Sequence, residues 1–233
     1  METQLRPAIV LLAAGSGSRF GNPANKVWIP LGGRRIISRS LMNATKSFPR
    51  ARIVLVINES DQLTAKKVLA RETPQLKVEI ILGGATRHES EFHALKYLKE
   101  DIELDNINVV IIHDGARPLA TSSLFRKITD SAFLHGGAIP VIMMEPRETD
   151  PLFSVNLARV QTPQAFHAKE LLIAYEAADR DGFSGTDTSA CMEKYFPGHK
   201  VVAVIGEVHN VKITYPQDLV IAAHILEKRR YKD

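Results

Sequence analysis

Cysteine is almost absent from this sequence. The chain of 233 residues contains one cysteine, Cys191, and one tryptophan. A single cysteine excludes an internal disulfide framework and any zinc site built mainly from cysteines. The sequence also lacks an apolar run of membrane length and a signal-like apolar segment at its start. We therefore expect a cytoplasmic protein with no membrane partner.

A large excess of one charge is also lacking. Lys and Arg together number 30 and Asp and Glu number 26, which gives a formal net charge of +4. Part of this excess lies in residues 228–232, where a solvated helix end explains it. No nucleic-acid partner is expected on this basis. The remaining composition, 45% hydrophobic and 24% charged, is that of an ordinary globular protein.

Short apolar runs alternate with segments of helical spacing. Strands are predicted from residue 9 and at 52–58, 77–82, 109–112, 138–144 and 200–205, and helices at 36–48, 62–72, 89–99, 121–134, 168–180 and 216–230. Residues 161–164 are predicted to form a turn. This alternation predicts an α/β fold with a mostly parallel twisted sheet and helices on both faces. No linker or repeat divides the chain, so a single domain over 1–233 is expected, with a short arm at about 145–158.

The loop that follows the first apolar run is rich in glycine. Gly15, Gly17 and Gly21 lie in it together with Arg19, and Lys26 follows. Backbone N–H groups of such small residues can approach a polyphosphate closely, and two cations add charge where phosphate oxygens would lie. The loop therefore predicts a triphosphate site, with an ordinary strand-to-helix turn as the alternative.

Two better-known glycine loops are excluded by their spacing. A Walker A loop needs Gly-x4-Gly-Lys followed by Ser or Thr, but here Lys26 lies past the last glycine and precedes Val27. The dinucleotide fingerprint Gly-x-Gly-x-x-Gly fails because three residues separate Gly17 from Gly21. A nicotinamide cofactor is therefore not expected.

Two more polar loops follow predicted strands. Gly83 and Gly84 follow the run at 77–82, and Asp114 comes shortly after the next aliphatic run. Ligands bind at the carboxyl ends of strands in open α/β sheets. An Asp at that edge is suited to hold a divalent cation, with a turn or helix cap as the alternative. His113 is interpreted as structural, since no second His, Cys or paired carboxylate stands at a metal-ligand spacing.

Six motifs, taken together, resemble one enzyme family. They are the glycine loop with Arg19 and Lys26, Gly83-Gly84-x-x-Arg87-x-x-Ser90, His113-Asp114-x-Ala116-Arg117-Pro118, Thr162-Pro163-Gln164, Thr186-Asp187 and Asn210-Val211-Lys212-Ile213-Thr214. In this order the chain resembles, over nearly its whole length, the 2-C-methyl-D-erythritol 4-phosphate cytidylyltransferases of non-mevalonate isoprenoid synthesis. The resemblance implies a Rossmann-like nucleotidyltransferase fold. It also implies transfer of CMP from CTP to a phosphorylated polyol, 2-C-methyl-D-erythritol 4-phosphate, with release of pyrophosphate.

The resemblance further implies roles for individual residues. It implies CTP contacts from Ala13, Ala14, Gly15, Ser16, Gly17, Gly83, Arg87, Ser90 and Ala116. It implies catalytic cations at Arg19, Lys26 and Lys212, and acceptor contacts from Arg117, Thr162 and Thr186. A magnesium ion is implied near Asp114. A homodimer is expected on the same basis.

One segment departs from the family pattern. In the family, the segment after the fifth-strand Pro-Val forms an arm that packs against a second subunit and supplies an acceptor-binding arginine. Here only about twenty residues separate Val141 from Thr162, and neither Arg147 nor Arg159 aligns cleanly with that arginine. Two alternatives stay open. Close relatives that make CDP-ribitol from ribitol 5-phosphate share most of the motifs, and the altered arm supports a nucleotide-binding module without turnover.

Overall fold

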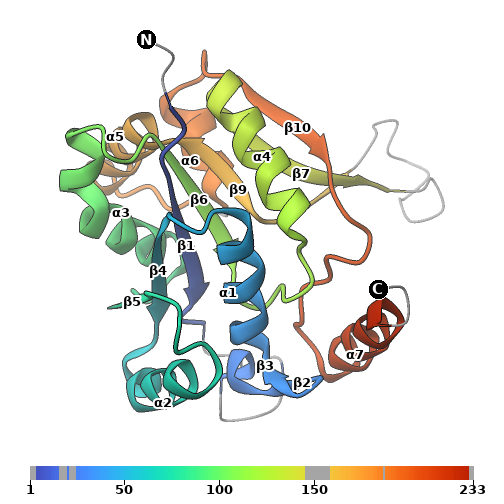
Figure 1. Cartoon of the computed structure of the whole chain (residues 1–233). Coiled ribbons are helices and arrows are strands. Elements are labelled where there is room, and N and C mark those ends of the chain that lie inside the picture. Colours follow the sequence, from blue (N-terminus) through green and yellow to red (C-terminus); the bar gives the residue numbers. More distant parts are fainter. Residues whose placement is uncertain (1–3, 16–19, 21–24, 145–157, 186, 231–233) are drawn as a thin grey trace.

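A central sheet runs through the computed structural model, which describes residues 4–15, 20, 25–144, 158–185 and 187–230 (Figure 1). Its strands are β1 (Pro7–Ala13), β4 (Arg52–Ile57), β5 (Glu79–Leu82), β6 (Val109–Asp114), β7 (Gly137–Met143), β8 (Ala158–Val160), β9 (Gln164–His167) and β10 (Val201–Ile205). The spatial order is β10-β7-β9-β6-β1-β4-β5, and β8 pairs with β7. β1 is parallel to β4 and β6, β4 to β5, and β7 to β10. The sequence-based prediction of a mostly parallel sheet is confirmed.

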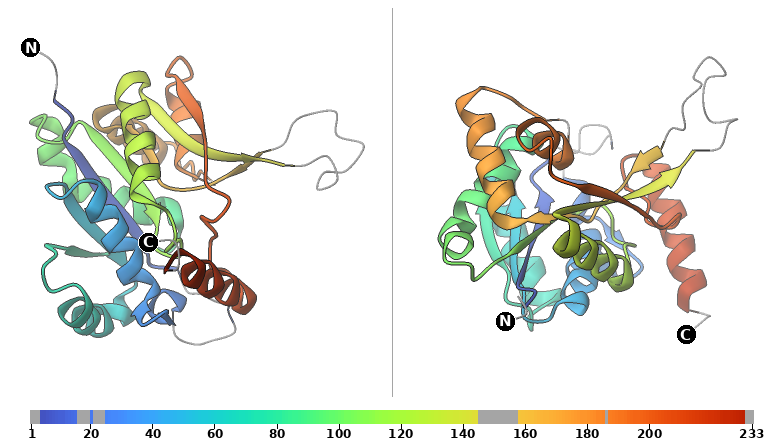
Figure 2. Two further views of the ribbon diagram at one scale, coloured as in Figure 1. Left: turned by 45° about the vertical axis from the view of Figure 1, so that its right-hand side comes forward. Right: turned by 90° about the horizontal axis from the view of Figure 1, so that it is seen from above.

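Helices cover both faces of this sheet (Figure 2). α1 (Ile36–Ser47), α2 (Gln62–Glu72) and α4 (Ser122–His135) pack on one face, and α3 (Arg87–Glu103), α5 (Ala168–Arg180) and α6 (Thr188–Tyr195) on the other. Successive residues of β1 alternate between the two layers, with Ile9 and Leu11 in the first core and Ala8 and Val10 in the second. A strand buried on both faces needs an unbroken apolar run, and the sequence supplies one.

A third, smaller core lies beside the hairpin of β2 (Pro30–Leu31) and β3 (Arg34–Arg35). It joins Leu31 and Ile36 to Ala222 and Ile225 of α7 (Pro216–Arg230), with Ile213 between them. This core anchors the segment that leads into α7. Within the described residues, no helix combines the length and apolar character that crossing a membrane requires.

The order in which strands are added to the sheet reverses at β1. β4 and β5 extend to one side of β1, and the chain then returns to place β6 on its other side. In open α/β sheets such a reversal leaves a crevice outside the carboxyl ends of the strands, where ligands bind. The strands β1, β4, β5 and β6 are parallel, so the loops that follow β1, β5 and β6 all lie at this edge.

Two details of the prediction are wrong. Residues 161–164 do not form only a turn, since Gln164 begins β9, which runs antiparallel to both β6 and β7. Four residues carry little periodicity, and this strand is fixed by neighbours distant in sequence. The helix predicted at 89–99 starts earlier, at Arg87, because the Thr86 hydroxyl caps it by accepting the N–H of Glu89 at 3.1 Å. The arm at about 145–158 lies outside the described residues except for its last residue, and the single-domain organisation stays a prediction.

Candidate active site

A cleft of about 460 Å³ opens at the carboxyl edge of the sheet, a size that suits a small-molecule ligand. Nine of its lining residues have a role that the sequence analysis assigned to them: Ala13, Ala14, Gly15, Lys26, Arg87, Ser90, Asp114, Ala116 and Lys212. These residues come from positions up to two hundred apart in the chain and from five separate segments. The fold therefore brings most of the predicted nucleotide site, the metal candidate and two of the catalytic cations into one cleft.

The first wall of the cleft is built by the end of β1 and by a short 3-10 helix, η2 (Lys26–Trp28). Asn25 joins them: its side-chain amide donates to the carbonyl of Ala13 at 2.6 Å, and its oxygen accepts the N–H of Val27 at 3.3 Å. Asn25 is buried and thereby fixes where Lys26 enters the cleft. The sequence analysis missed Asn25, although Asn directly before a short helix is a common cap signal.

Glycine is required at Gly83 by close packing. A Cβ on Gly83 would lie 2.5 Å from the Cβ of Ala14 and 2.7 Å from the hydroxyl oxygen of Ser90. The loop after β5 therefore packs against the loop after β1, and Ser90 fixes it further by accepting the N–H of Gly84 at 3.1 Å. Gly15 is different, because a Cβ there would meet no atom of the described residues within 4 Å apart from its chain neighbours. Its missing side chain widens the cleft instead of relieving a clash.

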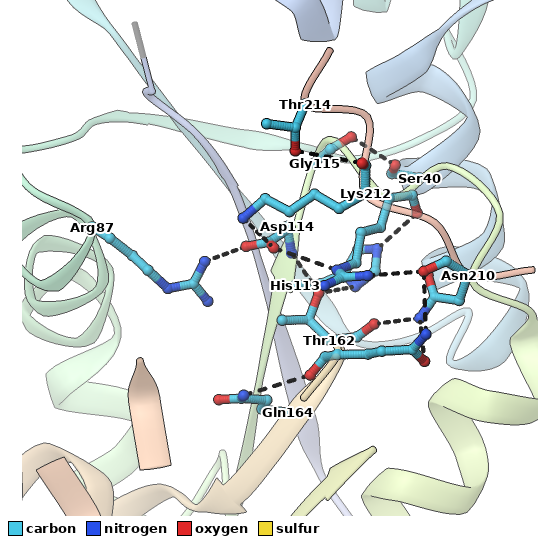
Figure 3. Close-up of polar contacts among 12 residues, drawn as sticks. Ser40, Arg87, His113, Asp114, Gly115, Thr162, Gln164, Asn210, Lys212 and Thr214 are labelled. Atoms are coloured by element: carbon cyan, nitrogen blue, oxygen red, sulfur yellow. Dashed lines mark hydrogen bonds and ion pairs between the residues drawn. The ribbon is translucent and has the colours of Figure 1, made fainter. Parts of the chain in front are cut away.

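The centre of the site is the carboxylate of Asp114, at the end of β6 (Figure 3). Arg87 reaches it from α3 and donates to Oδ1. Lys212 contacts the other carboxylate oxygen, with Nζ 2.9 Å from Oδ2, and Nε of Arg117 lies 3.5 Å from the same oxygen. Three cations that the sequence assigns to nucleotide or acceptor thus converge on one anion.

The three cations keep Asp114 ionised although it is buried. Burial by itself raises the pKa of this carboxyl, but the charges of Arg87, Lys212 and Arg117 outweigh it and hold the pKa well below its ordinary range. Arg117 is itself 12% exposed, and burial lowers its pKa. Glu91 also pairs with Arg87, so two carboxylates face three cations and the cluster keeps an excess of positive charge. An anionic ligand would offset that excess.

The Thr162 hydroxyl fixes the backbone of Asp114, and His113 in turn pairs with that hydroxyl. The Thr162 hydroxyl accepts the backbone N–H of Asp114 at 3.0 Å and lies 3.1 Å from Nδ1 of His113. Burial lowers the pKa of His113 to about 4, so its ring is neutral near pH 7. Nε2 of that ring lies 3.2 Å from the carbonyl of Arg117 and must carry the proton, which leaves Nδ1 to accept from Thr162. The structural interpretation of His113 agrees with this arrangement, and the Thr162 hydroxyl is already engaged within the protein.

The segment that carries Lys212 is fixed by backbone groups on both sides. Ile213 donates its N–H to the carbonyl of Ala116 at 2.9 Å. Asn210 donates its side-chain amide to the carbonyl of Thr162 at 2.8 Å, and its own carbonyl accepts from Arg117 at 2.8 Å. Asn210 is fully buried, and its role is positional. The sequence analysis included Asn210 in a motif but gave it no role, because these partners are distant in sequence.

A divalent cation would find one carboxylate in this cleft. Among the residues that the structure describes, no three His, Cys, Asp or Glu side chains gather as a protein-held metal site needs. Asp114 lines the cleft, but cations engage both of its oxygens. At nucleotide sites Mg²⁺ is commonly bound by one or two carboxylates together with substrate phosphates. The residues present fit an ion held mainly by a nucleotide, with Asp114 as its protein ligand, and do not fit a preformed metal site.

Four of the predicted site residues lie outside the described part of the chain. They are Ser16, Gly17, Arg19 and Thr186. Arg147 lies outside it as well, whereas Arg159 is an exposed residue of β8. The predicted roles of the four residues, and the identity of the arm arginine, stay predictions.

Comparison with known proteins assigns the family. The family model described as 2-C-methyl-D-erythritol 4-phosphate cytidylyltransferase (IspD) matches residues 8–228 of this chain. A protein of that name from Bacillus velezensis is 34% identical over 227 residues, which cover 94% of this chain and 95% of the relative. Another from Geobacillus kaustophilus is 33% identical and covers 94% of this chain and 96% of its own length.

A solved structure agrees with these sequence matches. The crystal structure of 4-diphosphocytidyl-2C-methyl-D-erythritol synthase from Anaerococcus prevotii superposes with a TM-score of 0.78 at 26% sequence identity, over 96% of each chain. The matches to this family thus extend over nearly the whole chain. The chain belongs to the 2-C-methyl-D-erythritol 4-phosphate cytidylyltransferase family and is a nucleotidyltransferase.

Proposed function

We propose that this enzyme transfers CMP from CTP to 2-C-methyl-D-erythritol 4-phosphate and releases pyrophosphate, a step of non-mevalonate isoprenoid synthesis. The observation that carries the proposal is the convergence of Arg87, Arg117 and Lys212 on Asp114, which lines the cleft together with the family's loops. Two anionic substrates must meet in this reaction. A site with excess positive charge is suited to that task.

The reaction forms one P–O bond and breaks another. A phosphate oxygen of the acceptor attacks the α-phosphorus of CTP, and the bond from that phosphorus to the bridging oxygen breaks as pyrophosphate leaves. A phosphate monoester with a second pKa of about 6 is already ionised near pH 7 and needs no general base. The barrier is then mainly electrostatic and positional, which calls for fixed cations and N–H donors.

The cations of the site divide between the two substrates. Lys26, which lines the cleft beside the first glycine loop, and Arg19 are assigned to the β and γ phosphates and to the charge that develops on the leaving group. Lys212 is assigned to the incoming phosphate of the acceptor. Arg117 contacts Asp114 close to Lys212 and is assigned to the acceptor with Thr162 and Thr186.

Magnesium is part of the proposal. When bound, Mg²⁺ would neutralise phosphate charge between the nucleotide and Asp114. Asp114 lies among the groups that would contact both substrates. If Arg87 or Lys212 left Asp114 to bind a phosphate, the carboxylate could serve as the protein ligand of Mg²⁺. The homodimer and the cytoplasmic location expected from the sequence also stay predictions.

The alternative functions are less well supported. The match to the methylerythritol phosphate enzymes extends over 94% of the chain in the relatives described above, which favours that acceptor over ribitol 5-phosphate. A module without turnover would have no use for Lys26, Asp114 and Lys212 in one cleft, yet all three line it.

The function is tested by measuring pyrophosphate release in a panel of four nucleoside triphosphates, each with 2-C-methyl-D-erythritol 4-phosphate and with ribitol 5-phosphate. The highest kcat/KM is expected for CTP with the methylerythritol acceptor. A higher kcat/KM with ribitol 5-phosphate would overturn the acceptor, and absence of release with every pair would favour the non-catalytic module.

A further inference from the structure

We propose that Glu91 is a positioning residue for the nucleotide site, because its buried carboxylate holds the Arg87 guanidinium between α3 and the cleft. Glu91 lies on α3 one turn after Arg87 and belongs to none of the six motifs. The inference rests on the proposed function in one respect, since that function assigns Arg87 to CTP.

Glu91 is enclosed by three helices. Its side chain is 1% exposed. One carboxylate oxygen, Oε1, accepts from the hydroxyl of Thr188 at 2.9 Å, and the other accepts from the hydroxyl of Tyr175. Nε of Arg87 lies 3.0 Å from Oε1. The two hydroxyls therefore use the group as a hydrogen-bond acceptor, and Arg87 adds a charge contact.

A buried carboxylate at this place is costly. The surrounding core of α3, α5 and α6 is apolar, and it includes Phe92, Leu95 and Met192. Burial raises the pKa of Glu91 above its ordinary value, although Arg87 and the two hydroxyls oppose that rise. Apolar residues of similar size often replace buried ion pairs with no loss of stability. Stability alone is therefore a weak reason for a carboxylate in this core, and an effect on Arg87 is a stronger one.

Arg87 lies between two carboxylates. Nη1 donates to Asp114, which lines the cleft, while the Nε side faces Glu91 in the core. Nε makes a charge contact with Glu91 but no hydrogen bond, so charge is what links these two side chains. Without that charge, Arg87 would have Asp114 as its remaining carboxylate partner. A nucleotide would then have to break a stronger pair to engage Arg87.

The same carboxylate also contacts the start of α6. Thr188 is in the first turn of α6 and follows Thr186, which is assigned to the acceptor, by two residues. Oε1 of Glu91 contacts both Thr188, at the start of α6, and the guanidinium of Arg87. Loss of the charge alone should change the Arg87 side and leave the hydrogen bond from Thr188.

The test compares E91Q and E91L with the wild-type enzyme by calorimetric titration of CTP and by steady-state kinetics. E91Q keeps the shape and an acceptor oxygen, and E91L suits the apolar surroundings. In each variant that melts within about 2 °C of the wild type, a range that corresponds to about 1 kcal/mol or less, the Kd for CTP should rise about tenfold while kcat changes less than about threefold. Y175F is the matched control, because it removes one donor to Glu91 and leaves Arg87 paired. Its Kd should stay within about threefold of the wild-type value.

A second comparison separates positioning from a general structural effect. In the R87A background, E91Q should change the Kd for CTP by less than about twofold, because the residue through which it acts is gone. Two results would overturn the proposal: wild-type CTP affinity in E91Q, or an equal rise in Kd with and without Arg87. Titrating the wild type with all four nucleoside triphosphates tests the proposed function first. If another nucleotide binds instead of CTP, that function fails and Glu91 is tested with the nucleotide that binds; if none binds, both fail.

Discussion

Two ion clusters lie at opposite ends of the parallel strands, and they differ in the sign of their excess charge. At the amino end, Arg52 of β4 pairs with Glu79 of β5 and with Asp101 of α3. Nε of Arg52 donates to Glu79 at 2.9 Å, and the three side chains are about one-third exposed (34%, 33% and 29%). At the carboxyl end, Asp114 is 8% exposed and faces three cations.

The comparison shows which property indicates a ligand site. The Arg52 cluster has two carboxylates for one guanidinium, and the Tyr97 hydroxyl adds a further hydrogen bond to Glu79 at 2.8 Å. Its single cation, Arg52, is already paired with two carboxylates of the protein. The cluster at Asp114 has cations left over, at the edge of the sheet where ligands bind. Ion pairs alone are therefore uninformative, whereas unbalanced cations beside a cleft predict an anionic substrate.

The largest effect is expected from the cations beside the glycine loop. Lys26→Ala and Arg19→Ala should each lower kcat by about 10² or more, as when one preorganised charge donor is lost from a transition state. Steady-state rates at saturating CTP and Mg²⁺ check this. Lys66→Ala, an exposed lysine of α2, is the matched control and should keep the wild-type rate. A near wild-type kcat in either site variant would remove its catalytic assignment.

The next effect concerns the metal. Chelation should abolish activity, and Asp114→Asn should raise the Mg²⁺ concentration for half-maximal rate by about tenfold, since a neutral amide is a poorer ligand for a hard cation. The measurement is a Mg²⁺ titration of the rate at fixed CTP. If the titration curve of the variant coincided with that of the wild type, Asp114 would act only in holding Arg87, Arg117 and Lys212.

A pH effect on stability should come from the buried histidine behind Asp114. His113 has a pKa of about 4 in the folded protein and an ordinary value of 6.5. Between these values the unfolded chain binds the extra proton, so the free energy of unfolding should fall by about 1.4 kcal/mol per pH unit as the pH drops. The loss from this group should begin near pH 6.5 and level off below about pH 4. Urea unfolding of wild type and His113→Gln across that range measures the difference, and equal slopes would contradict the burial argument.

A smaller effect is expected when the exposed cluster is broken. Arg52→Leu should lower the free energy of unfolding by about 1 kcal/mol, because a partly exposed ion pair contributes little and because Glu79 and Asp101 lose their shared cation. The rate with CTP and acceptor should stay within about twofold of the wild type. Denaturant unfolding and steady-state kinetics measure both. A loss of rate without a loss of stability would show that the two clusters do not differ as described.

Much of this site could be predicted from the sequence because parallel strands end at one edge of a sheet. That rule by itself places the glycine loop, Gly83 and Asp114 side by side. The Thr86 cap and its Glu89 partner also carried a sequence signal, since Thr followed three residues later by Glu is a capping box.

Other features depended on contacts between distant segments. The strand β9 is only four residues long, and its place between β6 and β7 has no local signal. The spacing of Arg87 and Glu91 allows a pair on one helix, but the burial of that pair depends on Tyr175 and Thr188 from two other helices. The ring orientation of His113 likewise requires Thr162 and the backbone of Arg117.

The most direct test of the central claim, that the excess cations at Asp114 serve two different substrates, is the CTP affinity of Lys212→Ala measured by calorimetry. The charge of Lys212 is assigned to the acceptor phosphate, so the Kd for CTP should stay within about threefold of the wild type while kcat/KM for the acceptor falls about 10²-fold. Lys200→Ala, an exposed lysine away from the cleft, should change neither value. A Lys212→Ala enzyme that loses CTP binding would contradict the division of the site between nucleotide and acceptor.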